Sequence, residues 1–122
     1  ICHAEPAKAF LAKLGEADAL IISFAEHNGN YSVAFKNLFD WCTRIEPKVF
    51  QGKPTALLAT SDGGRGAITV LELAAASLPR FGADVRGTFS LPNFSENFDA
   101  AEGVMKNADF DQGLKDLLAK LS

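Results

Sequence analysis

Residues 18–29 read DALIISFAEHNG, an apolar run that passes directly into a small polar loop. Residues 18–24 do not alternate apolar and polar side chains, which is typical of a central strand buried on both faces of a parallel sheet. Ser32 then provides an N-cap for a helix that continues to Arg44 with apolar residues at helical spacing. A strand, a polar loop and a helix in this order predict an α/β fold with a ligand site at the loop.

The same pattern occurs a second time along the chain. Residues 55–60 form another apolar run, and residues 61–66 form a polar loop that contains three glycines. Residues 67–81 then predict an amphipathic helix that ends at Gly82. Both loops follow the carboxyl end of a strand, so we expect them to face each other across one edge of the sheet.

Three further segments complete the expected fold. Residues 85–91 predict a third strand, which Gly87 interrupts and Pro92 closes, and its weaker apolar content indicates a position towards an edge of the sheet. Residues 6–14 predict a short amphipathic helix, and Asp109 is the expected N-cap of a last helix. Residues 98–107 leave a small hairpin and an irregular excursion both open. The order of elements predicts parallel strands joined by right-handed crossovers.

Composition limits the classes of partner. The chain has 122 residues, of which 48 % are hydrophobic, so we expect one folded domain. A net charge of -3 gives no electrostatic reason for binding to nucleic acid or to an anionic membrane surface. The apolar runs are too short to span a bilayer. We therefore expect a cytoplasmic protein with no nucleic-acid or membrane partner.

The cysteines and histidines do not indicate a metal site or a disulfide framework. Cys2 and Cys42 do not form the pattern of a disulfide-rich secreted domain, and Cys42 is expected to be a small buried residue. His3 and His27 lack other ligands at metal-binding spacing, so no metal is expected.

The two loops suit a planar cofactor that is rich in hydrogen-bond acceptors. Their backbone N–H groups and the positive ends of the following helices favour electron-rich groups, and the glycines allow a flat ligand to approach the main chain. Residues 61–69 lack the ending of a P-loop, and residues 64–66 lack the third glycine of a dinucleotide fingerprint. No Gly-x-Ser-x-Gly motif indicates a nucleophilic enzyme.

A longer motif identifies a family. Ala25-Glu26-His27-Asn28-Gly29, followed by Lys36-Asn37 and Asp40-Trp41, resembles the Pro-Glu-Tyr-Asn-Gly and Leu-Lys-Asn-x-x-Asp-Trp signature of the NAD(P)H-dependent FMN reductases, which include quinone, chromate and azo reductases. The segment from Gly52 to Gly66 resembles that family's second flavin-side loop, and the likeness covers residues 17–92. Three positions depart from the family pattern: Ala25 replaces Pro, His27 replaces Tyr, and Ser32 replaces Pro.

The resemblance implies a flavodoxin-like, doubly wound parallel sheet in three α/β/α layers. It implies that hydride passes from NAD(P)H through bound FMN to a quinone, a flavin or a similar small acceptor, with no catalytic side chain. The residues implied to border the flavin ring come from both loops: Ala25, Glu26, His27, Asn28 and Gly29 from the first, and Ser61, Asp62, Gly63 and Gly64 from the second. Lys36, Asn37, Asp40 and Trp41 are implied to fix the helix and a subunit interface instead.

The resemblance also implies that the domain, residues 1–122, is partial. Family members begin with a strand and a Ser- and Arg-containing loop for the FMN phosphate, and neither precedes Ile1. The first βαβ portion would then be absent, the strand at residues 20–24 would be an uncovered edge, and the chain would carry half of a flavin site.

Other interpretations stay open at this point. The domain could be a non-enzymatic electron carrier or a cofactor-free interaction domain. Glu26 could be a solvated loop acid, Asn28-Gly29 a simple turn, Gly63-Gly64 a flexible connection and Arg65 a solvent-exposed side chain. A homodimer or homotetramer is expected from the aromatic residues near the first long helix, which exceed what one sheet face needs: Tyr31, Phe35, Phe39 and Trp41.

Overall fold

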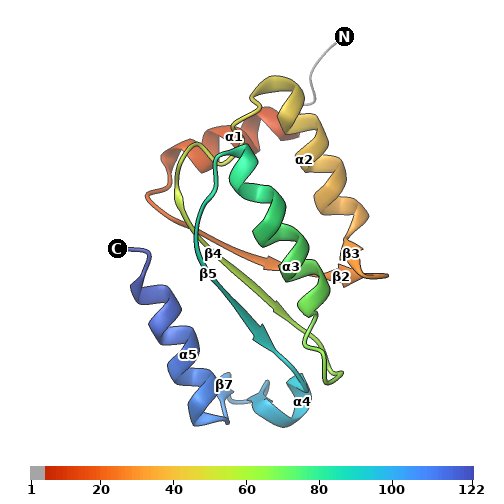
Figure 1. The fold of residues 1–122 in the computed structure, drawn as a ribbon, viewed down its shortest axis with the longest axis vertical. Helices are drawn as coiled ribbons and strands as arrows, with labels where there is room; N and C mark the ends of the chain where they lie inside the picture. Colours follow the sequence, from red (N-terminus) through yellow and green to blue (C-terminus); the bar gives the residue numbers. More distant parts are fainter. Residues whose placement is uncertain (1–4) are drawn as a thin grey trace.

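The computed structural model describes residues 5–122, so Cys2 and His3 lie outside the described residues. Its main sheet has three strands, β1 (Leu20–Phe24), β4 (Pro54–Thr60) and β5 (Asp84–Leu91), in the order β1-β4-β5 (Figure 1). Both neighbouring pairs are parallel. The predicted α/β class, the parallel pairing and the edge position of the third strand are therefore confirmed.

Three helices pack against one face of this sheet: α1 (Glu5–Glu16), α2 (Val33–Ile45) and α3 (Ile68–Ser77). Alternate strand residues point towards them, as the pleat of a strand requires. The buried side chains of this core are contributed by the strands (Leu20, Phe24, Leu57, Ala59) and by the helices (Ala7, Leu14, Phe39, Cys42, Val70, Leu71, Ala74). The prediction that Cys42 is buried is confirmed.

Helix α5 (Ala108–Ala119) packs against β5 from the opposite face, which gives the three predicted layers. Gly87 makes this approach close, because a Cβ atom at that position would lie 2.7 Å from Cδ1 of Leu117. Leu117 is buried, together with Ala56 and Leu91 on the same side of the sheet. The glycine that weakens this strand in the sequence pattern thus provides the space for helix packing.

Strand β1 differs from the expectation of a strand buried on both faces. Leu20 and Phe24 are buried against the helices, but Ile21 is 56 % exposed and Ser23 is also exposed. Within residues 5–122, β1 pairs only with β4, so one of its backbone edges is uncovered. The central position predicted from its composition is wrong here, and the uncovered edge implied by the family resemblance is confirmed for these residues.

Two helix boundaries also differ from the sequence prediction. Helix α3 ends at Ser77, and Leu78–Phe81 form a 3-10 turn, η1, in which Pro79 cannot continue the α-helical hydrogen bonding. Gly82 ends this turn with φ +88°, as predicted. The N-cap of α5 is Asn107 and not Asp109, since Oδ1 of Asn107 accepts hydrogen bonds from the backbone N–H groups of Asp109 (2.9 Å) and Phe110 (3.1 Å).

The segment left open by the sequence contains a hairpin. A short helix, α4 (Phe94–Asn97), leads into β6 (Phe98–Asp99), which pairs antiparallel with β7 (Val104–Met105). The connection between these strands turns through Gly103, which has φ +70°.

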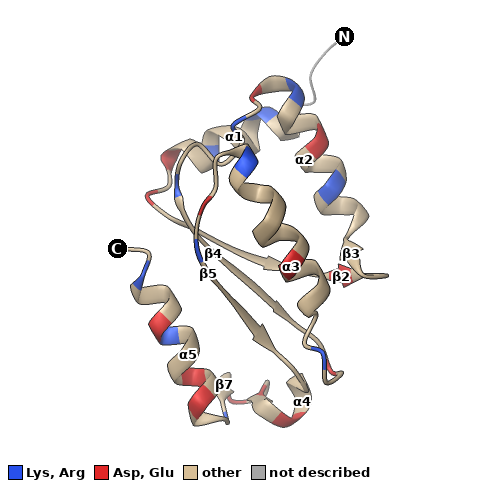
Figure 2. Cartoon of the chain, in the orientation of Figure 1, with Lys and Arg blue, Asp and Glu red and all other residues tan. Residues whose placement is uncertain are grey.

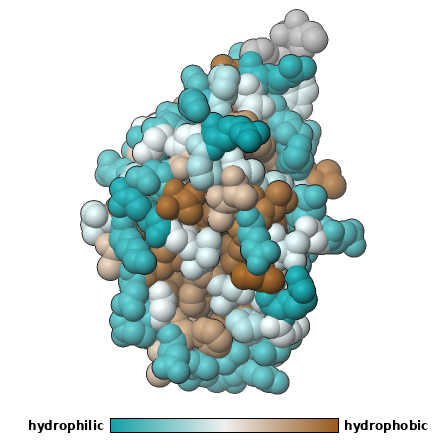
Figure 3. All heavy atoms as spheres, viewed as in Figure 1, coloured by the Kyte–Doolittle hydropathy of each residue, from teal (hydrophilic) through white to brown (hydrophobic). Residues whose placement is uncertain are grey.

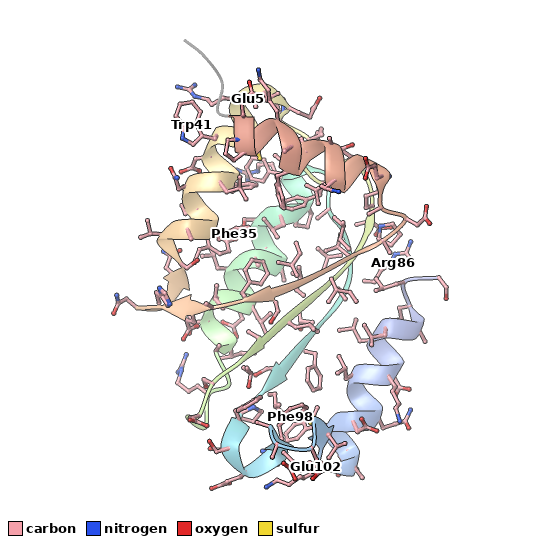
Figure 4. The ribbon with its side chains drawn as sticks, turned by 180° about the vertical axis from the view of Figure 1, so that it is seen from behind. Glu5, Phe35, Trp41, Arg86, Phe98 and Glu102 are labelled. Atoms are coloured by element: carbon pink, nitrogen blue, oxygen red, sulfur yellow. The ribbon has the colours of Figure 1, made fainter. Side chains whose placement is uncertain are left out.

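The aromatic residues near α2 form part of the core rather than a surface patch. Phe35 stacks on Phe39 with ring centroids 5.8 Å apart, and Tyr31 lies 4.9 Å from Phe35. Figure 4 shows Phe35 pointing from α2 towards the sheet and Trp41 pointing away from it. The expectation of surplus aromatic surface therefore holds only for Trp41, which is 37 % exposed.

Charged residues of both signs are interspersed over the elements (Figure 2). Among residues 5–122, no helix is both long enough and apolar enough to cross a membrane.

Candidate functional site

Two loops open at the same edge of the sheet. The first loop, residues 25–31, follows β1, and the second loop, residues 61–66, follows β4. Because β1 and β4 are parallel neighbours, their carboxyl ends lie side by side (Figure 1). The structure therefore brings the two groups of predicted cofactor-binding residues to one edge.

The first loop is a tight hairpin. Its strands β2 (Glu26–His27) and β3 (Asn30–Tyr31) pair antiparallel, and Asn28 and Gly29 between them have φ +54° and φ +73°. Positive φ at both central residues is the geometry of a type I′ turn, for which Asn-Gly is the preferred sequence. The interpretation of Asn28-Gly29 as a turn is thus confirmed. Ala25, His27, Asn28 and Gly29 are all exposed.

Glu26 reaches from this hairpin to helix α3. Its Oε1 atom accepts a hydrogen bond of 2.7 Å from the backbone N–H of Val70. The N-cap position of α3 is Ala67, which has φ +59° and supplies no side-chain acceptor. Glu26 is therefore not merely a solvated acid, and the first turn of α3 is partly satisfied from within the protein rather than left open for a ligand.

The second loop is held by the segment that follows β5. The backbone carbonyl of Gly63 accepts a hydrogen bond from the N–H of Asn93 (3.0 Å), and the carbonyl of Ser61 accepts one from the N–H of Phe94 (2.9 Å). The carboxylate of Asp62 accepts from the backbone N–H of Ser95 (2.9 Å) and from its hydroxyl (2.6 Å). These bonds to Ser95 lower the pKa of Asp62.

Residues 92–97 therefore form a third segment at the same edge, which the sequence analysis did not include. The signal that could have found it was present, since Pro92 closes the third strand and the residues after it follow a carboxyl end. The bond between Gly63 and Asn93 also shows that Gly63-Gly64 is anchored on one side and is not simply a flexible connection.

The second loop leaves backbone donors open. Among residues 5–122, the N–H groups of Asp62, Gly63 and Gly64 donate no hydrogen bond. Both glycines are exposed, and a Cβ atom at Gly64 would have no other atom within 4 Å. Three free backbone donors, two of them on glycines that have no side chain, suit the acceptor atoms at the edge of a flavin ring, so these residues fit FMN as a ligand.

The end of the second loop is buried and hydrogen-bonded by contrast. Gly66 is buried with φ +60°, and its carbonyl accepts a hydrogen bond of 2.7 Å from the hydroxyl of Ser90. Arg65 is exposed, and its Nη2 donates to Oγ1 of Thr69 at 2.6 Å. The loop thus combines an open tip with a fixed base.

A groove of about 380 Å³ lies between α2 and α3, on the face shown in Figure 3, where apolar residues gather at the surface. None of the nine predicted cofactor-binding residues lines it. Its lining includes Asn30 and Tyr31 from the first loop, and then Lys36, Phe39, Asp40, Thr43, Leu73, Ser77 and Phe81. The residues described contain no cluster of three or more potential metal ligands.

Comparison with known protein families identifies the family of this chain. The model of the NADPH-dependent FMN reductases matches residues 2–105. The chain belongs to this family. The Lys36 and Asp40 of the family signature form an ion pair of 2.8 Å on the exposed side of α2.

Two curated relatives of this FMN reductase family member are named as quinone reductases. An NADPH:quinone oxidoreductase from Arabidopsis thaliana is 37 % identical over 59 residues, which covers 48 % of this chain and 30 % of the relative. A 2-hydroxy-1,4-benzoquinone reductase from Burkholderia sp is 38 % identical over 63 residues, covering 51 % of this chain and 34 % of the relative. The match thus spans about a third of the length of these relatives.

One solved structure resembles this family member over nearly the whole length of the chain. The flavoenzyme NAD(P)H:(acceptor) oxidoreductase FerB from Paracoccus denitrificans superposes with a TM-score of 0.74 at 24 % identity. The match covers 97 % of this chain and 66 % of FerB. The flavodoxin-like fold implied by the sequence motif is confirmed.

Proposed function

We propose that the protein is an FMN-dependent NAD(P)H oxidoreductase that reduces a quinone, a flavin or a similar small acceptor. When bound, FMN supplies the chemistry by accepting a hydride from NAD(P)H and passing it on, and the protein binds and orients the reactants. Family membership and the names of the relatives support this proposal.

The observation that carries the proposal is a set of backbone N–H groups in the second loop that donate no hydrogen bond. The N–H groups of Asp62, Gly63 and Gly64 donate to no described residue, and the glycines leave the main chain uncovered. Such donors can bind the acceptor atoms along one edge of a flavin ring, as oriented main-chain N–H groups do in other anion and phosphate sites. Ser61 holds the start of the loop through its bonds to the chain around β5.

The first loop forms the other side of the proposed site. Ala25, His27, Asn28 and Gly29 are exposed on a hairpin whose type I′ turn fixes the main chain, so they contribute mainly backbone groups. Glu26 is directed to α3. No side-chain acid or base is needed for hydride transfer through a flavin, and we assign no catalytic residue.

Binding of FMN and oxidation of NAD(P)H together test the proposal. Titration of the protein into FMN should quench the flavin fluorescence, and NADPH should then be oxidised in the presence of a benzoquinone. Gly64→Val adds a side chain at the open tip, where φ is not positive, and should weaken FMN binding by about tenfold or more without changing the melting temperature. Ala12→Leu on the exposed side of α1 is the matched control and should bind as the wild type does.

The outcomes separate the candidate functions. Binding of FMN without NADPH oxidation would favour an electron carrier. Absence of FMN binding by the wild-type protein would contradict the proposal.

We further propose a homodimer or homotetramer in the cytoplasm, where NAD(P)H is supplied. Val33 is 82 % exposed and Trp41 is 37 % exposed, and the two lie eight residues apart on the outer side of α2. Residues at spacings of four share one helix face, so these two exposed apolar side chains lie on the same face of α2, with the polar Asn37 between them. Two exposed apolar side chains on one face of the signature helix suit contact with a second copy.

A further inference from the structure

We propose that Glu26 is a positioning residue that holds the first loop at the distance from the second loop that FMN binding requires. This inference rests on the proposed function. It assigns no contact between the carboxylate of Glu26 and the cofactor. It assigns the carboxylate to the first turn of α3 instead, where its hydrogen bond to Val70 spans 44 positions of sequence.

The beginning of α3 explains why an acceptor from elsewhere is needed. Gly66 and Ala67 both have left-handed backbone conformations, with φ +60° and φ +59°, and the helix starts immediately after them. Ala67 has no side chain that could cap the helix, although the first N–H groups of a helix need acceptors. The Oε1 atom of Glu26 supplies one at 2.7 Å from the N–H of Val70.

The tip of the hairpin lies near the same turn of α3. A Cβ atom built at Gly29 would lie 3.7 Å from Cγ2 of Thr69. The hairpin is therefore close to Thr69 at its tip, and Glu26 bonds it to the N–H of Val70. Both residues belong to the first turn of the helix.

The first turn of α3 is continuous with the second loop. The chain passes from the open donors through Arg65 and Gly66 into the helix, and Gly66 is fixed by the hydroxyl of Ser90. A bond from the hairpin to Val70 consequently ties the first loop to the base of the second. Loss of that bond is expected to loosen the hairpin relative to the second loop, although the pairing of β1 with β4 still joins the two strands that carry the loops.

Substitutions of Glu26 can separate the effect of its hydrogen bond from the effect of its charge. A carboxylate at a helix N-terminus is favourable both as a hydrogen-bond acceptor and as a negative charge near the positive end of the helix. The amide oxygen of Gln has the same reach and accepts the same bond, but it carries no charge. Ala removes the acceptor and the charge together.

The experiment compares the wild-type protein with Glu26→Ala, Glu26→Gln and the control Glu72→Ala. Glu72 is an exposed residue of the same helix, and its carboxylate accepts no hydrogen bond within residues 5–122. One readout is the FMN dissociation constant from fluorescence quenching. The other is hydrogen exchange of the Val70 amide without FMN, which reports the cap directly.

Glu26→Ala is expected to weaken FMN binding by about tenfold and to accelerate exchange of the Val70 amide. Glu26→Gln is expected to stay within about threefold of the wild type in both readouts, and Glu72→Ala to match the wild type. Circular dichroism confirms that each variant is folded.

Two results would overturn the inference alone. Wild-type FMN affinity in Glu26→Ala, despite faster exchange at Val70, would show that the cap is only structural. Affinity in Glu26→Gln as weak as in Glu26→Ala would show that charge rather than position matters. Failure of the wild-type protein to bind FMN would instead overturn the proposed function, and this inference with it.

Discussion

The carboxylate of Asp62 accepts two hydrogen bonds from Ser95, one from the backbone N–H at 2.9 Å and one from the hydroxyl at 2.6 Å. The two residues lie 33 positions apart and join the second loop to the segment after β5. The segment after β5 therefore holds the open tip of the proposed flavin site in place through these hydrogen bonds.

Substitution of Ser95 should change the titration of Asp62. The two bonds from Ser95 lower the pKa of Asp62 from its ordinary value of 3.8. Ser95→Ala removes the hydroxyl donor, so the pKa should rise towards 3.8, as followed by the carboxyl carbon in NMR. Ser95→Thr keeps the hydroxyl and is the control. An unchanged pKa in Ser95→Ala would contradict the assignment of this bond.

The same bonds predict a direction for stability against pH. A carboxyl with a lowered pKa in the folded state stabilises the protein above its unfolded pKa, and this contribution is lost as the pH falls through the folded value. The wild type should therefore lose more stability than Ser95→Ala when the pH is lowered through and below 3.8. Thermal melting between neutral and acid pH measures this difference, and equal losses would argue against it.

Gly66 and Gly64 should respond very differently to replacement by alanine. A Cβ atom at Gly66 would collide with the hydroxyl of Ser90 and lie 2.9 Å from the nitrogen of Pro92, at a φ of +60°. Gly66→Ala should therefore destabilise the protein by about 1–3 kcal/mol or more. Gly64→Ala meets no atom within 4 Å and should change stability by less than about 0.5 kcal/mol. Chemical denaturation measures both, and equal effects would contradict the packing at Gly66.

Cys42 should be unreactive while the protein is folded. The side chain is 0 % exposed, and burial raises the pKa of its thiol above 9.0. Since the thiolate is the reactive form, alkylation at neutral pH should be slow until the protein unfolds. Stability should also fall as the pH rises past 9.0, because the unfolded chain ionises first. Peptide mass mapping identifies the labelled cysteine, and rapid labelling of Cys42 under native conditions would oppose this account.

Trp41 should contribute to the proposed assembly. Trp41→Lys places a charge on the exposed face of α2 that carries Val33 and Trp41, and we expect it to reduce the molar mass measured by light scattering to that of a monomer. Trp41→Phe retains an aromatic surface and serves as the control. A wild-type protein that is already monomeric at assay concentration would count against the assembly.

Much of the fold was predictable because it depends on local patterns. The position of Ser32 before an apolar stripe indicates a helix cap, and its hydroxyl accepts the N–H of Phe35 at 3.1 Å. Gly82 indicates a helix stop because glycine readily adopts a positive φ, and it has φ +88° in the structure. The strand–loop–helix repeat similarly placed both loops at one edge.

The remaining features depend on partners that are distant in sequence. The apolar run of β1 predicts burial on both faces, but burial of Ile21 requires a neighbour that residues 5–122 do not place there. Asp109 and Asn107 are both good caps, and the approach of the chain from β7 selects Asn107. The bond from Glu26 to Val70 joins the first loop to helix α3 across 44 positions of sequence, so no local pattern indicates it.

The most direct test of the flavin site follows the backbone amides of the two loops by NMR during titration with FMN. The account predicts that the amide signals of Asp62, Gly63 and Gly64 shift together with those of the hairpin at Asn28 and Gly29. The amide of Lys53, at the opposite end of β4, should not shift. Saturating FMN that leaves the loop amides unchanged, or that shifts amides at the other end of the sheet instead, would contradict the central claim.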